Sequence, residues 1–275
     1  MWWNYLLIIC IVCAVLSAVG FIKFVYFLSI GYGFAIAGGG ITALIIALKN
    51  GCTSGVTWLA VLQTMLFIAY GARLSGFLLV REFKSSGFQK AIKTEISGFK
   101  KLPIFVSIPI WLCVAVLYTA QVSPMFYRYA NQSKDIAVPV IGILVSICGL
   151  ILESVADKQK SAQKKLNPGM VATQGLYRIV RCPNYFGEII FWTGVFISGL
   201  TTYNGVGQWL MAIIAYISII YIMFNGAQRL EKRQMARYGE DKAYKEYADT
   251  TPIIIPFLPI YHLNKKSYQG MLEGT

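Results

Sequence analysis

Long hydrophobic stretches separated by short polar ones run along most of the chain. Seven of them are long and mostly apolar, near residues 3–22, 24–48, 56–80, 102–121, 136–152, 186–200 and 206–228. A helix needs about 20 such residues to cross the hydrocarbon core of a bilayer. The pattern therefore predicts an all-α integral membrane protein, a bundle of about seven transmembrane helices. The sixth stretch is short, so we expect it to be tilted or half-buried.

The amino-acid composition agrees with a membrane protein. The 275 residues are 56% hydrophobic and 13% charged, with a mean hydropathy of +0.58, whereas soluble domains average roughly 45–50% apolar and 25% charged residues. No tandem repeat or low-complexity block stands out, so we expect a single membrane domain over 1–275. Its first part, 1–121, has no carboxylate before Glu82, and the second part, 135–275, holds most of the polar chemistry.

The basic residues are distributed unevenly between the two sides of the predicted bundle. With the N-terminus outside, 21 of the 25 Lys and Arg residues face inward, in Lys23, 81–101, 153–185 and the tail from Arg229. This asymmetry is the positive-inside signature of a multi-pass membrane protein. It explains the net charge of +13 without nucleic acid. We expect a cytoplasmic C-terminus in a bacterial inner membrane or endoplasmic reticulum membrane, contact with membrane lipids, and no obligate protein partner.

The stretch GLYRIVRCPNYFGE carries the most informative polar residues, because it lies between hydrophobic runs at a predicted membrane surface. Polar groups there need a partner, since lipid does not satisfy them. Arg178 and Arg181 suit phosphate, which guanidinium groups bind with paired hydrogen bonds. Asn184 and Glu188, four residues apart behind Pro183, share one helix face. This is a candidate cradle for a phosphorylated cofactor.

Two further segments carry polar residues on the same predicted side. In the connector 153–169, Glu153 and Asp157 lie one turn apart, and Lys164 precedes a proline and glycine where the helix is expected to end. Carboxylates suit ribose hydroxyls and lysine suits phosphate, although an exposed helix with surface ion pairs has the same pattern. In the tail, Arg229, Arg233 and Arg237 recur at helical spacing beside three tyrosines, Tyr238, Tyr244 and Tyr247. The three prolines of 251–261 prevent a regular span.

The third span places Tyr70 and Arg73 on one helical face, with Gln63 two turns earlier. An arginine within a span snorkels to the surface, forms an ion pair or lines a polar cavity. We favour a pocket, because the Tyr70 hydroxyl adds a proton donor on the same face. The glycine-rich run 31–40 suits close helix packing, with ligand contact as the alternative. A metal site is not expected, since His262 is the only histidine and the cysteines lie mostly in apolar spans.

The chain resembles the membrane steroid 5-alpha-reductase family (3-oxo-5-alpha-steroid 4-dehydrogenase C-terminal domain), including its bacterial relatives of the DUF1295 type. The resemblance is strongest over 153–257 and fainter over 70–84. The bacterial motif arginine-histidine-proline-asparagine-tyrosine is matched from Arg181 to Tyr185, with Cys182 in place of the histidine. It implies a seven-helix membrane bundle in which cytoplasmic loops and the C-terminal tail hold NADPH, with 1–121 on the substrate side and 135–275 binding the cofactor.

The resemblance also assigns roles to individual residues. It implies that Tyr70 is the catalytic tyrosine. It suggests cofactor contacts for Lys84, Glu153, Asp157, Lys164, Asn184, Glu188, Tyr238 and Arg233, with Arg229 as an alternative to Arg233. The other candidate cofactor-binding residues are Arg73, Arg178 and Arg181, noted above, and Tyr185 of the matched motif. Animal steroid reductases have a glutamate in the second span, and this chain has none, so the carbonyl-polarising role falls on Tyr70 alone or with Gln63.

These observations favour an NADPH-dependent reductase of an activated C=C bond in a steroid or another hydrophobic lipid enone. A tyrosine hydroxyl that donates to the carbonyl oxygen stabilises the charge that develops there. The alternative enzyme is an isoprenylcysteine or phospholipid-type methyltransferase that uses S-adenosylmethionine, because that family resembles the same arginine-proline-tyrosine-glutamate core. The third interpretation is a membrane protein that binds ligands without catalysis, which the missing second-span carboxylate supports.

Overall fold

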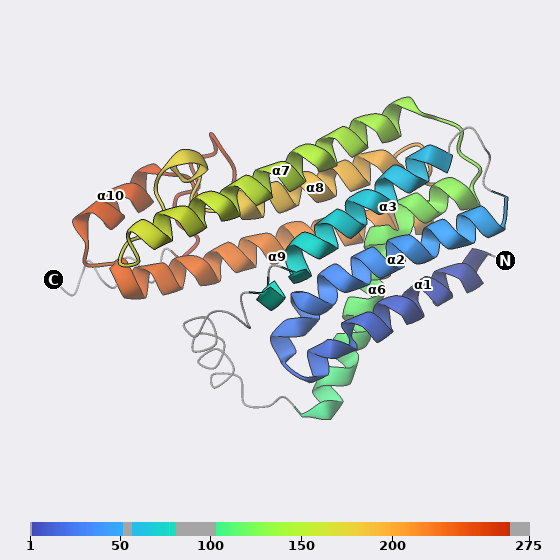
Figure 1. The fold of residues 1–275 in the computed structure, drawn as a ribbon, viewed down its shortest axis with the longest axis horizontal. Coiled ribbons are helices and arrows are strands. Elements are labelled where there is room, and N and C mark those ends of the chain that lie inside the picture. Colours follow the sequence, from blue (N-terminus) through green and yellow to red (C-terminus); the bar gives the residue numbers. More distant parts are fainter. Residues whose placement is uncertain (1, 52–56, 77, 81–102, 265–275) are drawn as a thin grey trace. The chain divides into compact units, whose positions relative to one another are not determined.

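The computed structural model describes residues 2–51, 57–76, 78–80 and 103–264, and every regular element in these residues is helical, as predicted. The helices are shown in Figure 1. Their bounds are α1 Trp2–Ser17, α2 Ile30–Lys49, α3 Thr57–Gly71, α6 Ile104–Ala130, α7 Ala137–Leu166, α8 Pro183–Gly199, α9 Val206–Tyr238 and α10 Lys242–Thr250. Short 3₁₀ turns cover Ala18–Phe21, Phe24–Leu28 and Gly175–Arg178, and a π-helical turn covers Ala72–Gly76.

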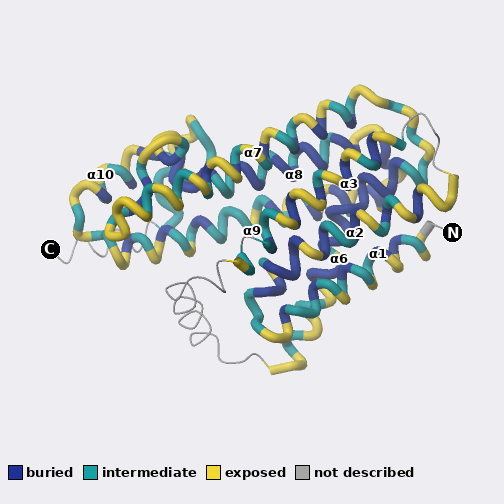
Figure 2. The backbone as a smooth tube through the Cα atoms, viewed as in Figure 1, coloured by how far each residue is buried: buried dark blue, intermediate teal, exposed yellow. Residues whose placement is uncertain are grey.

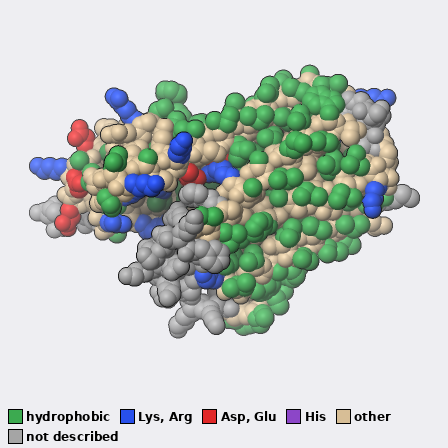
Figure 3. Space-filling model, viewed as in Figure 1, with side chains coloured by type: hydrophobic (Ala, Val, Ile, Leu, Met, Phe, Trp, Pro, Cys, Tyr) green, Lys and Arg blue, Asp and Glu red, His purple; other side chains and the backbone are tan. Residues whose placement is uncertain are grey.

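Six helical segments of the described chain are long and apolar enough to cross a membrane. They are Trp3–Phe21, Phe24–Lys49, Thr57–Val80, Ile104–Ala130, Ala137–Leu166 and Val206–Tyr238. The predicted stretch 186–200 corresponds to α8, whose 17 residues make it the short helix anticipated from the sequence. Figure 3 shows hydrophobic side chains spread over the visible face of the first helices. The protein is therefore an integral membrane helical bundle.

Several helices continue beyond their apolar stretches. The α6 helix runs to Ala130, α7 to Leu166 and α9 to Tyr238, where hydropathy alone placed the ends near 121, 152 and 228. The extensions of α7 and α9 are rich in Ala, Lys, Gln, Glu and Arg, which are strong helix formers. Hydropathy shows where the apolar stretch of each helix ends. The high helix propensity of the polar residues that follow explains why the helix continues beyond that point. The sequence had already indicated helical spacing in both polar extensions.

The chain divides into two compact units. The first comprises Met1–Ile143 with Val195–Tyr216, and the second comprises Leu144–Gly194 with Ile217–Thr275. The prediction of a single membrane domain over 1–275, with a substrate side and a cofactor side, stays a prediction.

In the first unit, α2 packs against α1, α3 and α6, and Figure 2 shows it largely buried. Glycine makes the contact with α3 close: a Cβ built on Gly71 would lie 2.3 Å from the carbonyl oxygen of Gly33. The hydroxyl of Ser75 donates to the carbonyl oxygen of Ile30 at 2.7 Å across the same contact. The close-packing interpretation of the glycine run therefore holds at Gly33, since backbone meets backbone there.

In the second unit, glycines join α7 to α8. A Cβ on Gly149 would lie 2.4 Å from the backbone nitrogen of Phe191, and a Cβ on Gly187 would lie 2.6 Å from Cγ of Glu153. No side chain fits at either position without a shift of the helices. The α8 helix begins at Pro183, where proline is favoured because the first turn needs no N–H donor.

The segment after α10 consists of bends and turns rather than a helix, as its prolines predict. It pairs with the chain just before α8, because the N–H of Arg181 donates to Pro252 O at 2.8 Å and the N–H of Cys182 donates to Ile253 O at 2.9 Å. Cys182, Ile253 and Ile254 share one buried cluster with α9. The tail is thus part of the core of the second unit.

Candidate functional site

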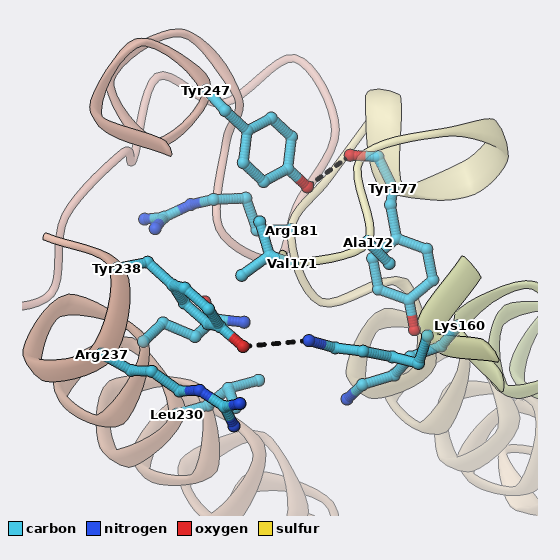
Figure 4. A pocket seen from close by; sticks show the side chains of 11 residues that line it. Lys160, Val171, Ala172, Tyr177, Arg181, Leu230, Arg237, Tyr238 and Tyr247 are labelled. Carbon is cyan, nitrogen blue, oxygen red and sulfur yellow. Dashed lines mark hydrogen bonds between the residues drawn. The ribbon is translucent and has the colours of Figure 1, made fainter. Parts of the chain in front are cut away.

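A cavity of about 170 Å³ lies within the second unit (Figure 4). Its walls come from the end of α7, the connector to α8, the end of α9 and α10. The lining residues are Lys160, Lys164, Val171, Ala172, Tyr177, Arg181, Leu230, Gln234, Arg237, Tyr238 and Tyr247. Because α7 and α9 extend well beyond their apolar stretches, their polar turns are available to form these walls.

The cavity is cationic. Its lining contains two lysines, Lys160 and Lys164, and two arginines, Arg181 and Arg237, but no carboxylate. Lys160 and Lys164 lie four residues apart in α7, so they project from one helix face. Arg181 shares its charge with a buried carboxylate, Glu231, and the other three basic residues add positive charge to the lining. Such a lining favours an anion, most strongly phosphate with its several acceptor oxygens.

Lys164 is held in position by neighbouring oxygen atoms. Its Nζ donates to Tyr238 Oη at 3.0 Å and also to the carbonyl oxygen of Met170. The ammonium lies 5.2 Å from the centroid of the Tyr238 ring, and the Arg237 guanidinium lies 5.2 Å from the same centroid. Contact with two cations is favourable for an aromatic face. Tyr238 therefore orders both charges at this wall.

Two further tyrosines, Tyr177 and Tyr247, line the cavity. Tyr247 Oη donates to the carbonyl oxygen of Tyr177 at 2.6 Å, which ties α10 to the connector (Figure 4). The Tyr177 hydroxyl is buried and has no hydrogen-bond partner among the residues that the structure describes. Burial raises the pKa of Tyr177, and the negative charge of Asp157 raises it further. The hydroxyl therefore stays protonated and can donate a hydrogen bond to a ligand.

Arg181 lies between the cavity and a buried carboxylate. Its Nη2 is 3.0 Å from Oε1 of Glu231, and each side chain is only 2% exposed. The same Nη2 donates to the carbonyl oxygen of Tyr261, whereas Nε has no partner within the described residues. The Nη2 of Arg181 is thus held by α9 and the tail, and its Nε–H can donate to another acceptor.

Glu231 also anchors the chain after α10. Besides Arg181, its carboxylate accepts from His262 Nδ1 at 3.0 Å, from the Leu263 N–H at 2.9 Å and from Asn264 Nδ2 at 3.0 Å. Four donors on one carboxylate satisfy most of its acceptor sites, which is what a buried charge requires. The tail is therefore fastened to the helix that forms one wall of the cavity.

His262 joins two carboxylates. Its Nε2 lies 2.8 Å from Oδ1 of Asp249, while Nδ1 faces Glu231. The hydrogen bond to Glu231 raises the pKa of His262, partial burial opposes this, and the bond to Asp249 raises it again. The net shift favours the charged imidazolium, in which both ring nitrogens donate.

The residues expected at the cofactor site separate into two groups in the second unit. Three of them, Lys164, Arg181 and Tyr238, line the cavity. Seven do not: Glu153, Asp157, Arg178, Asn184, Tyr185, Glu188 and Arg233. Arg178 and Arg233 are exposed, and it is Arg237, one turn after Arg233, that lines the cavity. The cofactor roles of all ten residues stay predictions.

Two of the expected carboxylates are buried in α7 and α8, outside the cavity lining. Glu153 is buried against Gly187. Glu188 is also buried, and it accepts a hydrogen bond from Trp192 Nε1 at 3.0 Å within α8. Asn184 is half-buried in the first turn of α8. None of the three residues is part of the cavity wall.

The expected substrate-side residues belong to the first unit. Tyr70 is fully buried, and its ring meets that of Tyr32 edge-on with 5.7 Å between centroids. Arg73 is half-buried in the π-helical turn that follows α3. Lys84 lies outside the residues that the structure describes. The catalytic role of Tyr70 stays a prediction.

Sequence reasoning did not single out several residues of this site. Lys160 precedes Lys164 by one helical turn, so the sequence shows that the two lysines form a basic pair. It does not show that both line one cavity. Tyr177 lies inside the stretch from Gly175 to Glu188, but nothing in the sequence indicates that its hydroxyl is buried without a partner among the described residues. Glu231 and His262 gave no signal, because their contact depends on how the proline-rich tail folds back onto α9.

Comparisons with known proteins show which family the chain resembles. The family described as "Protein of unknown function (DUF1295)" matches residues 33–251. The chain is 23% identical over 194 residues to the steroid 5-alpha-reductase DET2 of Gossypium hirsutum, covering 66% of this chain and 70% of that protein. It is 31% identical over 121 residues to the steroid 5-alpha-reductase DET2 of Arabidopsis thaliana, covering 43% of this chain and 41% of that protein. No solved structure matches significantly. The chain therefore belongs to the DUF1295 family, and its likeness to these two enzymes is consistent with the steroid 5-alpha-reductase family.

Proposed function

We propose that this protein is a membrane-embedded, NADPH-dependent reductase of an activated C=C bond in a steroid-like or other lipid enone. Its similarity to steroid 5-alpha-reductases supports a reductase acting on a CH–CH group. The observation that carries the cofactor assignment is the cationic cavity, which has four basic side chains and no carboxylate in its lining. We also propose that the N-terminus lies outside and that this cavity faces the cytoplasm, as the distribution of basic residues suggests.

The donors of the cavity suit the phosphate-bearing end of the cofactor. Lys160, Lys164 and Arg237 supply charge, and the Nε of Arg181 and the hydroxyl of Tyr177 are donors without a partner in the described residues. Sites for whole small-molecule ligands usually measure about 300–1,000 Å³, so a cavity of about 170 Å³ suits one end of a dinucleotide. We assign it to the adenosine 2′-phosphate end, where a cluster of cations favours NADPH over NADH.

The remaining chemistry is divided between cofactor and protein. When bound, NADPH supplies the hydride for the β-carbon of the enone. Tyr70 donates a hydrogen bond from its hydroxyl to the carbonyl oxygen, and its burial in an apolar core strengthens that bond as negative charge develops on the oxygen. The apolar helices of the first unit exclude water from the substrate. Membrane lipids and a hydrophobic small molecule are the partners that this proposal requires.

The methyltransferase alternative is less consistent with the cavity. S-adenosylmethionine carries a cationic sulfonium and no phosphate, so the basic lining of the cavity opposes its positive charge rather than binding it. No observed feature of the second unit favours that cofactor. The similarity to steroid 5-alpha-reductases points the same way.

The experiment that tests the proposal compares ligands on the purified full-length protein. We expect NADPH, and adenosine 2′,5′-bisphosphate as its phosphate-bearing fragment, to raise the unfolding temperature, and NADH to do so only at higher concentration. A ligand at 100 times its Kd stabilises the folded state by about 2.7 kcal/mol. Reduction of cholest-4-en-3-one is then followed by loss of the enone absorbance. Stabilisation by S-adenosylmethionine and not by NADPH would show that the proposal is wrong.

A further inference from the structure

Four consecutive apolar residues of the tail are exposed. Phe257 is 95% exposed, Leu258 44% and Ile260 37%, and Pro259 between them is exposed as well. Single exposed apolar side chains are common in proteins, whereas a run of three or four is kept only where it has a function. The run therefore needs a partner that removes it from water.

The tail loop, residues 253–260, presents this run on a defined backbone. The N–H of Ile253 donates to Ile260 O at 2.9 Å, which closes the loop at its base, and the N–H of Ile260 donates to Leu258 O at 2.7 Å. The two prolines of the loop restrict its backbone further, because each fixes its own φ. In Figure 1 the loop follows α10 and lies beside the connector before α8. The exposed side chains thus project from an ordered loop.

Phe257 has an unfavourable backbone conformation in this loop. Its φ is 65°, in the left-handed region that bulky residues rarely adopt. Strain of this kind persists only where the surrounding structure holds it, and it is concentrated at functional positions. Glycine or asparagine would take the same conformation at lower cost. In water, the exposed ring of Phe257 does not offset this cost.

The base of the tail loop packs where the apolar stretches of α8 and α9 meet the polar residues beyond them. Ile253 and Ile254 share a buried cluster with Ala227 of α9, and Phe224 of α9 and Ile189 of α8 pack against that cluster. Phe224 and Ala227 lie in the last turn of the apolar stretch of α9, which ends near residue 228. The base of the loop therefore lies at the edge of the membrane-spanning part of these helices.

The exposed run is close enough to this edge to contact lipid headgroups. Phe257 follows buried Ile254 by three residues, which span at most about 11 Å. The headgroup region of a bilayer is about 5–8 Å thick on each side. The side chains of the run consequently lie at or near the depth at which apolar groups enter the lipid.

Exposed basic residues border the loop. Arg178 is exposed in the connector and Arg229 is exposed in α9. These are the two elements to which the tail is hydrogen-bonded, through Cys182 and Gln228. Apolar side chains beside cationic ones are typical of segments that lie in the membrane interface, where the apolar groups enter the lipid and the cations contact phosphate.

We propose that the exposed run of the tail loop, Phe257, Leu258 and Ile260, inserts into the headgroup–acyl boundary of the leaflet in which α8 begins. Arg178 and Arg229 then contact the lipid phosphates. The loop is a lipid anchor in addition to the membrane-spanning helices. Lipid is the partner that fits, because the loop continues the apolar surface of α8 and α9 at the level where these helices leave the bilayer. The anchor does not depend on the proposed reaction.

The test measures the depth of a spin label on the full-length protein in vesicles of phosphatidylethanolamine and phosphatidylglycerol. The six native cysteines are replaced by alanine, and one cysteine is introduced by Phe257→Cys or Leu258→Cys. The matched control is Leu166→Cys. Leu166 is 88% exposed, but it ends α7 about 21 Å of helix beyond the apolar stretch that ends near 152.

Each label is exposed to oxygen, which concentrates in lipid, and to a nickel chelate, which stays in water and is present on both sides of the vesicles. We expect the labels at 257 and 258 to collide more often with oxygen than with nickel, at the depth of about 5–10 Å that interfacial segments reach. The label at 166 should show the reverse order. More collisions with nickel at 257 and 258 would place the loop in water and overturn the proposal. Protection from both reagents would mean that protein, such as a second copy of the chain, covers the loop, which also overturns it.

A second measurement tests whether the Phe257 ring holds the loop in the lipid. With the label at Leu258→Cys, the added change Phe257→Asp should raise collisions with nickel above those with oxygen, because a carboxylate is costly at the lipid boundary. The added change Leu166→Asp, at a similarly exposed position, should leave the label in lipid. If the label stays in lipid with Phe257→Asp, the ring does not anchor the loop and the proposal is wrong.

Discussion

Arg181 and Glu231 form a buried ion pair across 50 residues of sequence, with 3.0 Å between Nη2 and Oε1 and each side chain 2% exposed. The pair connects the connector before α8 to α9 and, through the other donors on Glu231, to the tail. Arg181 also lines the cationic cavity. One carboxylate therefore orders both the tail and a basic residue of the candidate site.

Removing that carboxylate is expected to destabilise the second unit strongly. Glu231→Ala leaves the Arg181 guanidinium buried without its counter-ion, and breaking a buried pair in this way costs about 3–5 kcal/mol. The measurement is denaturant-induced unfolding of the purified protein in detergent. Glu246→Ala, an exposed carboxylate in α10, is the control and should stay within about 0.5 kcal/mol of wild type. Equal stability of the two variants would contradict a structural role for the pair.

The tail contact should also depend on pH through His262. The hydrogen bonds to Glu231 and Asp249 raise the pKa of His262 above its value in the unfolded chain, with partial burial and the Arg181 charge opposing them. A raised pKa means that folding takes up a proton. The stabilisation is therefore complete below the unfolded value of about 6.5 and is lost as pH rises through the folded pKa.

His262 is the only histidine in the chain, so one variant isolates its contribution. The unfolding temperature of wild-type protein minus that of His262→Gln should be largest in mildly acidic buffer and shrink as pH rises beyond about 6.5. A difference that stays constant across this range would show that the imidazolium does not contribute.

A substitution of glycine by alanine should lower the stability of the protein at the close contact of α7 with α8 and raise it at an open position in α9. Gly149→Ala forces a Cβ to within 2.4 Å of the Phe191 backbone nitrogen, and overpacking of this kind costs about 1–3 kcal/mol. Gly207→Ala, in the first turns of α9 with nothing within 4 Å of the new Cβ, should stabilise the protein by about 0.5–1 kcal/mol through helix propensity. Thermal unfolding of both variants checks the pair, and a stabilising Gly149→Ala would show that the helices are not in close contact.

The helices were largely predictable from the sequence because lipid imposes one simple requirement, about 20 apolar residues for each span. The start of α8 at Pro183 and the end of α7 at Leu166 also followed local rules for prolines and glycines. The candidate site was less predictable. Which residues line the cavity depends on how the end of α7, the connector to α8 and the end of α9 pack together. No local sequence pattern shows that Arg237 lines it and Arg233, on the same helix, does not.

The cavity and the sequence motif assign the cofactor to different arginines, so four variants compare them. We expect Lys160→Gln and Arg237→Gln, both in the cavity lining, to weaken NADPH binding about tenfold each, the value of a charge-assisted hydrogen bond of about 1.5 kcal/mol. Arg178→Gln and Arg233→Gln remove charges from exposed positions outside the lining and should change the affinity much less. Calorimetric titration with NADPH gives the four values. The reverse order would favour the motif-based assignment over the cavity.

Tyr70 provides the last prediction, because its catalytic and packing roles give different results for one substitution. Tyr70→Phe removes only a hydroxyl and keeps the ring that meets Tyr32. If the tyrosine only packs, the protein loses at most one net hydrogen bond, about 0.5–1.5 kcal/mol of stability, and enone reduction continues.

If the Tyr70 hydroxyl stabilises the charge on the carbonyl oxygen, turnover of cholest-4-en-3-one should fall by roughly 10²–10³-fold, with NADPH affinity unchanged, since a transition-state donor acts on the chemical step. Tyr129→Phe is the matched control, because its hydroxyl donates to Asn50 O at 3.4 Å in an exposed part of the same unit. Steady-state kinetics with both variants decides between the roles. Near-normal turnover in Tyr70→Phe would exclude the hydroxyl from the reaction, and a loss of NADPH affinity would mean that the hydroxyl acts through the cofactor instead.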